Sequence, residues 1–295
     1  MKKVLFTGAG IAIITPFDAD NKVNFKKLGE IIDHQIENGT DAIIICGTTG
    51  EGATLDHEEH TEAIRFTVEH TAGRVPVIAG TGSNDTNYAV ILSNEAEKAG
   101  VDGLLMVTPY YNKTSQNGLI RHYSYIAERV SAPIILYNVP SRTGVNILPE
   151  TYYELSKLDR IVATKEASGD ISQIAATIAL CGDALTVYSG NDDQVTAIMS
   201  LGGKGVISVL SHVAPRVAHD MAASFLAGDP ARSAKLQLEW FDVCKALFAD
   251  VNPIPVKEAM NMMGWDVGEC RLPLAPMPAA KREVLRAAPG NHGLI

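Results

Sequence analysis

The sequence predicts an α/β protein built as a (β/α)8 TIM barrel with a small all-helical appendage at its C-terminal end. Eight short apolar segments, amphipathic helical patterns between them, and a final region without strand signal support this fold class. The apolar segments are rich in Ile, Val and Leu and almost continuous in hydrophobicity, which is typical of parallel strands buried on both faces. The predicted strands are residues 11–15, 42–46, 76–79, 103–107, 133–137, 161–165, 185–189 and 206–209.

Helical patterns with recognisable caps separate these strands. Asn24 can cap the first helix, and Gly39 follows its last apolar residue. Asp56 and Glu59 have the spacing of a capping box ahead of the second helix. Apolar faces of helical period also follow the third and fourth strands. Regular alternation of strand and helix favours a parallel sheet.

The number of strand–helix units favours a closed barrel. Eight units suit a (β/α)8 barrel, which typically needs about 250 residues. An open doubly wound sheet is the main alternative, but no GxGxxG motif occurs at the first strand–helix turn. We expect a catalytic barrel over residues 1–227 and a helical domain over residues 228–295. In the latter, residues 231–248 predict one long helix, residues 256–263 a second, and a last helix follows three prolines.

Composition narrows the class of protein. The 295-residue chain has a formal net charge of −9 and no run of Lys and Arg, so we expect no nucleic-acid partner. No segment reaches the ~20 apolar residues that a membrane-spanning helix needs. Gly8 and Gly10 interrupt the apolar N-terminal run, which favours a buried first strand over a signal peptide.

The cysteines indicate a reducing compartment. The chain has four, none in a CxxC pair, which favours free thiols over a disulfide framework or a zinc site. We therefore expect a cytoplasmic protein. The four are Cys46, Cys181, Cys244 and Cys270.

Polar and charged residues gather where the predicted strands end. Seven of the eight ends carry hydroxyls, glycines or charges, whereas the opposite ends are comparatively plain. Active sites of (β/α)8 barrels lie at the face where the C-terminal ends of all strands meet. We therefore expect an active site there. The seven ends are residues 15–17, 47–51, 80–83, 108–111, 137–142, 165–166 and 189–192.

Lys165 is the most informative of these residues, because it ends an otherwise apolar strand. A lysine inside the barrel loses hydration, which disfavours its ammonium form and leaves a neutral amine near neutral pH. A neutral amine can attack a ketone and form a Schiff base. The structural alternative is a lysine that extends to solvent or pairs with Glu166. The other polar strand ends favour the catalytic interpretation.

Four more residues have side chains suited to this chemistry. Tyr137 ends the preceding strand, and its phenol can move a proton to and from a carbinolamine oxygen. Thr48 and Thr49 lie in a glycine-flanked turn that we expect to open a helix, where hydroxyls and backbone N–H groups could hold a carboxylate. Arg142 offers a forked donor for a second carboxylate. Each residue also has a structural alternative. Tyr137 could be a core residue, the two threonines could serve turn and cap formation, and Arg142 could be a solvated loop residue.

Two further pairs suggest metal ligands only superficially. His57 and His60 have a helical i, i+3 spacing, but no further ligand is evident nearby, so a helix surface or an effector pocket is favoured. Asp192 and Asp193 are better explained as N-capping residues of a helix. We expect no metal site.

Six motifs resemble the dihydrodipicolinate synthase family. The agreement runs from the first strand to the segment Asn252-Pro-Ile-Pro-Val-Lys and so covers nearly the whole chain. Residues 47–51 and Lys165 also match the wider pyruvate-dependent aldolases, which include N-acetylneuraminate lyase and keto-deoxy-sugar aldolases. Residues 141–144 are more specific to the synthases. The six motifs are residues 47–51, 108–113, 137–144, 165–169, 189–193 and 205–209.

The resemblance implies a reaction. Pyruvate would form a Schiff base with Lys165, without a separate cofactor, and condense with L-aspartate 4-semialdehyde. The product would be 4-hydroxy-tetrahydrodipicolinate, on the route to diaminopimelate and lysine. The family also implies a homotetramer of two tight dimers. The implied site comprises Lys165, the proton relay Tyr137, Thr48 and Tyr111 (the last from a neighbouring subunit), Thr49 with Thr48 for the pyruvate carboxylate, Arg142 for the semialdehyde carboxylate, and the backbone of Gly190 and Ile207.

The resemblance also implies an effector site for lysine at the dimer interface. Matching positions are Asn84, His57, His60 and Tyr110. Two positions depart from inhibited members, which carry Ser in place of Gly52 and Glu in place of Tyr88. Loss of a buried charged partner typically costs a few kcal/mol. We therefore expect lysine inhibition to be weak or absent.

Two alternatives use the same fold. A pyruvate aldolase of sugar acids would share Lys165 and Tyr137 but would need hydroxyl-binding groups in place of Arg142. A non-enzymatic barrel that binds a small molecule, with His57, His60 and Tyr88 lining its pocket, is the other. The intact set of Lys165, Tyr137 and Thr48 argues against it.

Overall fold

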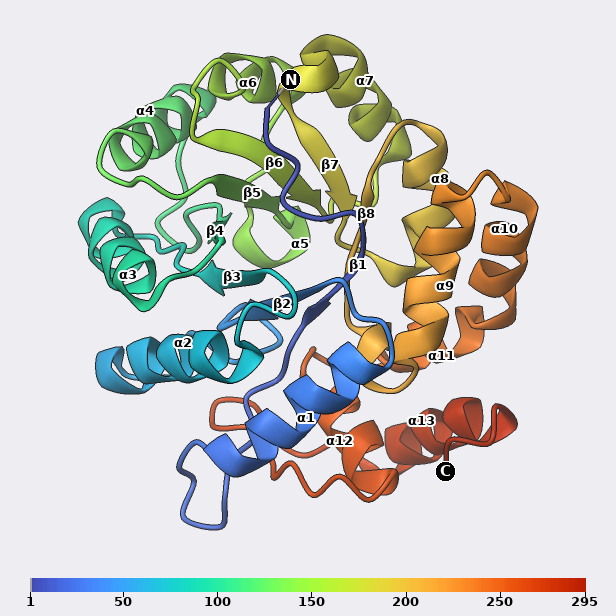
Figure 1. Cartoon of the computed structure of the whole chain (residues 1–295). Helices are drawn as coiled ribbons and strands as arrows, with labels where there is room; N and C mark the ends of the chain where they lie inside the picture. Colours follow the sequence, from blue (N-terminus) through green and yellow to red (C-terminus); the bar gives the residue numbers. More distant parts are fainter. Residues whose placement is uncertain (1) are drawn as a thin grey trace.

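The computed structural model describes residues 2–295 and confirms the (β/α)8 barrel (Figure 1). Eight parallel strands close in chain order, with β8 hydrogen-bonded to β1. All eight predicted strands are present, most of them within one or two residues of the expected bounds. They are β1 (Gly8–Ala12), β2 (Ala42–Ile45), β3 (Val77–Gly80), β4 (Gly103–Val107), β5 (Ile134–Asn138), β6 (Ile161–Glu166), β7 (Thr186–Ser189) and β8 (Gly205–Ser208).

The largest difference concerns the first strand, which was predicted over residues 11–15 and begins at Gly8. Gly8 has φ +105°, and its register partner across the β1–β8 seam is Gly205, with φ +152°. A Cβ atom at Gly205 would collide with the carbonyl oxygen of Gly8, so the close approach of the two strands requires glycine. Glycine carries no hydropathy signal, which explains why the apolar pattern placed the strand too late.

Helices surround the barrel, and several further helices follow it toward the C-terminus (Figure 1). The predicted Asn24 cap and the Asp56–Glu59 capping box are both present. The α-helices are α1 (Phe25–Glu37), α2 (His57–Thr71), α3 (Thr86–Ala99), α4 (Gln116–Ala127), α5 (Pro140–Thr143), α6 (Pro149–Leu155), α7 (Ile171–Cys181), α8 (Val195–Ser200), α9 (Pro215–Leu226), α10 (Pro230–Glu239), α11 (Phe241–Ala246), α12 (Ile254–Met262) and α13 (Ala279–Asn291). Short 3-10 turns are η1 (Gly182–Ala184), η2 (Asp192–Gln194) and η3 (Leu210–His212).

The single long helix predicted over residues 231–248 is wrong, because the chain forms α10 and α11 there. The break falls at Trp240, whose backbone leaves the helical conformation at φ −99° and ψ 12°. The indole stacks on the imidazole of His292 with ring centroids 4.1 Å apart. A local helical pattern cannot predict this contact, because His292 lies about 50 residues further along the chain.

Apolar side chains fill the barrel interior. Phe6, just before β1, stacks on Tyr188 of β7 with centroids 4.3 Å apart, and the Tyr188 hydroxyl donates to the Phe6 carbonyl oxygen at 2.7 Å. Ile44 and Ile135 belong to the same buried cluster. A filled interior leaves the C-terminal ends of the strands as the place for a site. Across residues 2–295, no helix has both the length and the apolar character needed to span a membrane.

Buried His212 joins the ends of β1 and β8 and should make the fold sensitive to acid. Its Nε2 accepts a hydrogen bond from the Ile14 N–H at 3.0 Å, and its Nδ1–H donates to the Val209 carbonyl oxygen at 2.9 Å. The bond that Nε2 accepts needs the neutral ring, because both nitrogens of a protonated ring are donors. Burial lowers the pKa of His212 to about 4, so the unfolded chain binds the extra proton first as the pH falls below about 6.5.

We expect His212 to contribute stability that is complete above pH 6.5 and lost progressively down to pH 4. The amount is on the order of a few kcal/mol. Urea unfolding between pH 7.5 and 4.5 measures it, with a His212→Gln variant for comparison. The variant should show a shallower dependence of unfolding free energy on pH; equal slopes would contradict the assignment.

Candidate active site

Lys165 and Tyr137 are register partners at the C-terminal ends of β6 and β5. The Lys165 residue is 5% exposed, and its Nζ lies 4.4 Å from the centroid of the Tyr137 ring. Tyr188 is the register partner of Lys165 on the other side, in β7. The structure therefore places an amine and a phenol side by side within the closed sheet.

The Glu166 carboxylate does not pair with Lys165, which removes the structural alternative of an ion pair between these neighbours. Glu166 accepts hydrogen bonds from the Tyr152 hydroxyl at 2.9 Å, from the Ser168 N–H at 2.8 Å, and from Asn138 at 3.1 and 3.2 Å. Burial raises the pKa of Glu166, and the bonds from Ser168, Tyr152 and Asn138 oppose that rise. Within residues 2–295 Glu166 forms no salt bridge. The carboxylate that does interact with the Lys165 charge is the buried one of Asp192, and this charge opposes the rise that burial causes in the pKa of Asp192.

The turn that carries Thr48 and Thr49 does not open a helix, contrary to the prediction. It lies between β2 and the start of α2 at His57, and the Glu51 N–H donates to the Thr48 carbonyl oxygen at 3.1 Å. Thr49 is buried, whereas Thr48 is partly exposed. Carboxylate binding here would depend on turn N–H groups and hydroxyls instead of a helix N-terminus.

A cavity of about 570 Å³ opens at these strand ends. It is lined by three of the predicted active-site residues, Thr48, Tyr137 and Arg142. Three residues of the predicted effector site line the same cavity, namely His60, Tyr88 and Tyr110. The two groups therefore face one continuous space.

Asn252 also lines this cavity and was not predicted as a site residue. Its Nδ2 donates to the Thr49 hydroxyl at 2.9 Å, and its carbonyl oxygen accepts from Arg142 Nη2 at 3.3 Å. Its Oδ1 is buried and has no hydrogen-bond partner in the part of the chain that the structure describes. A buried acceptor without a partner is costly, so Asn252 is suited to receive a donor from a ligand. Its place in the Asn-Pro-Ile-Pro motif was the only available signal.

The ends of β7 and β8 contribute packing around Lys165. A Cβ atom at Gly190 would lie 2.7 Å from Ala167 Cβ and 3.2 Å from Lys165 Cγ, so only glycine fits beside the lysine. Ile207 is fully buried inside the barrel. The expectation that Asp192 caps its own helix is wrong. Its buried carboxylate instead accepts hydrogen bonds from the backbone N–H groups of residues 209 and 210, at 2.8 and 2.9 Å.

Polar contacts and tight packing surround three positions of the predicted effector site. The Tyr88 hydroxyl lies 3.4 Å from His57 Nδ1, at the edge of the main cavity. His60 Nε2 lies 2.9 Å from the Gly80 carbonyl oxygen, and burial lowers the pKa of this imidazole. Gly52 packs so tightly that a Cβ atom there would collide with the Cys46 carbonyl oxygen.

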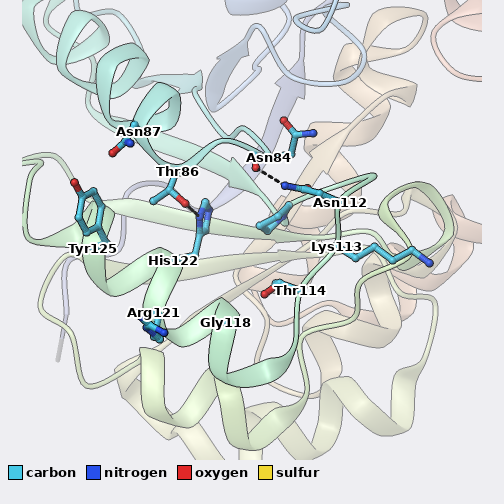
Figure 2. A pocket seen from close by; sticks show the side chains of 11 residues that line it. Asn84, Thr86, Asn87, Asn112, Lys113, Thr114, Gly118, Arg121, His122 and Tyr125 are labelled. Atoms are coloured by element: carbon cyan, nitrogen blue, oxygen red, sulfur yellow. Dashed lines mark hydrogen bonds between the residues drawn. The ribbon is translucent and has the colours of Figure 1, made fainter.

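A second cavity, of about 550 Å³, lies between α3 and α4 (Figure 2). Asn84 faces it, and its carbonyl oxygen accepts a hydrogen bond from the Asn112 side chain at 3.0 Å. His122 Nδ1 contacts the Thr86 hydroxyl at 2.8 Å there. Asn84 is therefore not among the lining residues of the main cavity. Tyr111, in the loop beside it, is 90% exposed and has φ +67°.

The histidine pair and the aspartate pair each stand without a third metal-binding side chain in the part of the chain that the structure describes. Within residues 2–295, no group of three or more His, Cys, Asp or Glu side chains is arranged to hold a metal ion. The four cysteines are free thiols.

The fold and site together define a class: a (β/α)8-barrel enzyme with a buried lysine and a tyrosine at the catalytic face, the arrangement of Schiff-base lyases. Residues 5–289 match the model of the dihydrodipicolinate synthetase family, and the chain belongs to that family.

Similar proteins agree over their full length. A 4-hydroxy-tetrahydrodipicolinate synthase of Lachnoclostridium phytofermentans is 57% identical over 292 residues, which are 99% of each chain. The crystal structure of a dihydrodipicolinate synthase from Thermotoga maritima matches with a TM-score of 0.96 and 42% identity, covering 99% of this chain and 100% of that one. The structure of the Cyanidioschyzon merolae enzyme with lysine bound has a TM-score of 0.96 and 39% identity, with coverage of 99% and 100%.

Proposed function

We propose that this enzyme condenses pyruvate with L-aspartate 4-semialdehyde to give 4-hydroxy-tetrahydrodipicolinate. Relatives that are more than 50% identical over 98% or more of the chain carry the name of this synthase. The observation that carries the proposal is the buried Lys165 amine, which lies 4.4 Å from the Tyr137 ring centroid.

The chemistry begins at Lys165. Its amine attacks the keto carbon of pyruvate, and loss of water gives the Schiff base. Loss of a methyl proton then gives an enamine, whose carbon attacks the aldehyde. The amino group of the semialdehyde next attacks the former keto carbon, releases Lys165 and closes the ring. Tyr137, Thr48 and Tyr111 move the protons that these steps require.

The remaining residues hold the two substrates. Thr48 and Thr49 bind the pyruvate carboxylate through their turn, while Gly190 and Ile207 contact it through their backbone. Arg142 binds the carboxylate of the semialdehyde as a forked donor. The unpartnered Asn252 Oδ1 lies on the same cavity and is suited to accept from the semialdehyde amino group.

A coupled assay with pyruvate and L-aspartate 4-semialdehyde tests this proposal most directly. Activity with this pair and not with sugar-acid aldehydes is expected. Efficient cleavage of N-acetylneuraminate or a 2-keto-3-deoxy acid would favour the related aldolases instead. A barrel that only binds small molecules would turn over neither.

Lysine should inhibit this enzyme weakly or not at all, and Tyr88→Glu should make inhibition stronger. No carboxylate lining the main cavity is free to hold an ammonium group, because Glu51, its single acidic lining residue among those described, is paired with Lys257. A glutamate at position 88 supplies that charge. Steady-state rates with increasing lysine measure the effect, with Tyr153→Glu, at an exposed tyrosine of α6, as control. Submillimolar half-inhibition of the unmodified enzyme would contradict the expectation.

Tyr111 supports an assembly in which subunits complete each other's sites. An exposed tyrosine with strained backbone is suited to extend into a neighbouring subunit. Membership of the family supports the further proposal that the enzyme is a homotetramer of two tight dimers. The four free cysteines support a cytoplasmic location. Sedimentation velocity combined with mixing of inactive Lys165 and Tyr111 variants tests this, because hybrid dimers should regain part of the activity.

A further inference from the structure

A buried ion pair connects the helical C-terminal segment with the turn that carries Thr48 and Thr49. Lys257 Nζ of α12 lies 2.7 Å from Glu51 Oε1, and the two side chains are 2% and 1% exposed. The other Glu51 oxygen accepts a hydrogen bond from the backbone N–H of Arg271 at 2.9 Å. Glu51 itself has φ +52°, a conformation that needs support from its surroundings.

The ammonium group of Lys257 has further contacts that hold it in place. Lys257 Nζ also donates to the Glu269 carbonyl oxygen at 3.0 Å and lies 4.1 Å from the centroid of the Phe17 ring. The Arg271 guanidinium contacts the same ring at 4.3 Å. Burial and the neighbouring Glu51 charge raise the pKa of the Cys270 thiol to about 12. Because these contacts hold Lys257, they also hold the Glu51 carboxylate that is paired with it.

A second, independent contact reaches the same turn. Asn252, five residues before Lys257, donates to the Thr49 hydroxyl at 2.9 Å. Thr15 donates to the carbonyl oxygen of Gly50 at 2.6 Å, between the two contacts. Three consecutive residues of the turn, 49, 50 and 51, are therefore each held by a side chain from a distant segment.

Stability alone does not explain a charged pair at this position. Removing two ions from water costs several kcal/mol each, and an apolar pair of similar volume is often as stable or more stable. In several proteins a buried polar or ionic group instead selects one conformation of the groups around it. Glu51 lies three residues from Thr48, so that geometry is transmitted directly to the turn.

We propose that Lys257 is a positioning residue, which through Glu51 fixes the turn of Thr48 and Thr49 in the conformation that binds the keto-acid carboxylate. The helical segment is then part of the active site, although none of its residues reacts. The inference rests on the proposed function, because it takes pyruvate as the ligand of this turn.

The test compares Lys257→Met, Glu51→Gln and the double variant. Methionine keeps an unbranched apolar stem, and glutamine keeps an acceptor for the Arg271 N–H. The readouts are the pyruvate concentration that gives half-maximal borohydride trapping on Lys165, and the Tm. Arg282→Met is the matched control, because it removes an ion pair between α13 and Glu258 of α12 that lies away from the turn.

Lys257→Met should lower the Tm, because Glu51 is left buried without a counter-charge, and should raise the half-saturating pyruvate concentration about tenfold or more. The double variant removes both charges, so it should recover the Tm but not the pyruvate affinity. Glu51→Gln should raise the half-saturating concentration as well, and Arg282→Met should leave it unchanged.

One outcome would count against the inference, and two others have a different meaning. If the double variant recovers both Tm and pyruvate affinity, the ion pair is structural only and the inference is wrong. If Lys257→Met does not fold, the double variant and Glu51→Gln still decide the question. If the unmodified enzyme itself traps no pyruvate, the proposed function fails and not the positioning role.

Discussion

Replacing Lys165 with methionine is expected to lower kcat/KM by several orders of magnitude and to abolish borohydride trapping of pyruvate. Methionine keeps an unbranched stem against the Tyr137 ring but cannot form a Schiff base, so the variant should fold and still lack covalent catalysis. Steady-state rates and the mass of the peptide that contains residue 165 measure both effects.

Lys157 offers a closely matched control. Its Nζ also lies 4.4 Å from the centroid of a tyrosine ring, that of Tyr153, but its side chain is exposed and paired with Glu154. Lys157→Met should therefore leave activity and trapping unchanged. Substantial turnover by the Lys165 variant, or an adduct on another lysine, would remove Lys165 from the mechanism.

Replacing Arg142 with alanine is expected to lower kcat/KM for L-aspartate 4-semialdehyde by about two orders of magnitude or more. Arg142 is an exposed residue that lines the cavity, and the bound semialdehyde would cover it. Truncating one partner of a charge pair that the substrate desolvates in this way costs roughly 2–5 kcal/mol, and each 1.4 kcal/mol corresponds to a factor of ten. Half-saturation of trapping by pyruvate should change little, because Thr48 and Thr49 hold its carboxylate. The loss should therefore appear only with the second substrate.

Arg121 provides the comparison for this variant. It faces the second cavity between α3 and α4, so Arg121→Ala should retain the full rate (Figure 2). Arg142→Lys should recover only part of the activity, because an ammonium cannot form the two parallel bonds of a guanidinium. Near-normal activity of Arg142→Ala would favour an aldolase of sugar acids.

Hydrophobic pattern was sufficient to predict the barrel, because strands buried on both faces are apolar throughout. It was insufficient at Gly8, where close packing of two strands demands glycine and so erases the apolar signal. It was also insufficient at Trp240, where the helix is interrupted and the indole stacks on His292, a residue distant in the chain. Both errors involve contacts between residues far apart in the chain.

The site shows the same difference between what local sequence patterns predict and what contacts between distant segments determine. Lys165 and Tyr137 could be predicted as neighbours, because adjacent parallel strands end at one face. The contacts of Asn252 and Lys257 with the Thr48–Thr49 turn could not, because they join segments about 200 residues apart and no local pattern specifies them. Asp192 was misassigned for the same reason, since its carboxylate binds backbone N–H groups after β8 instead of those of its own helix.

The continuity of the main cavity has a consequence for inhibitor design. Tyr88, Tyr110, Tyr137 and Arg142 all line one space. A single molecule that carries both an aromatic group and a carboxylate could contact the tyrosines of the predicted effector site and Arg142 together. Once its first group is bound, the second group would bind at a high effective concentration. The translational and rotational freedom of the molecule is lost in the first step and not again in the second. Such a compound would compete with substrate and would owe its selectivity to its contact with Tyr88.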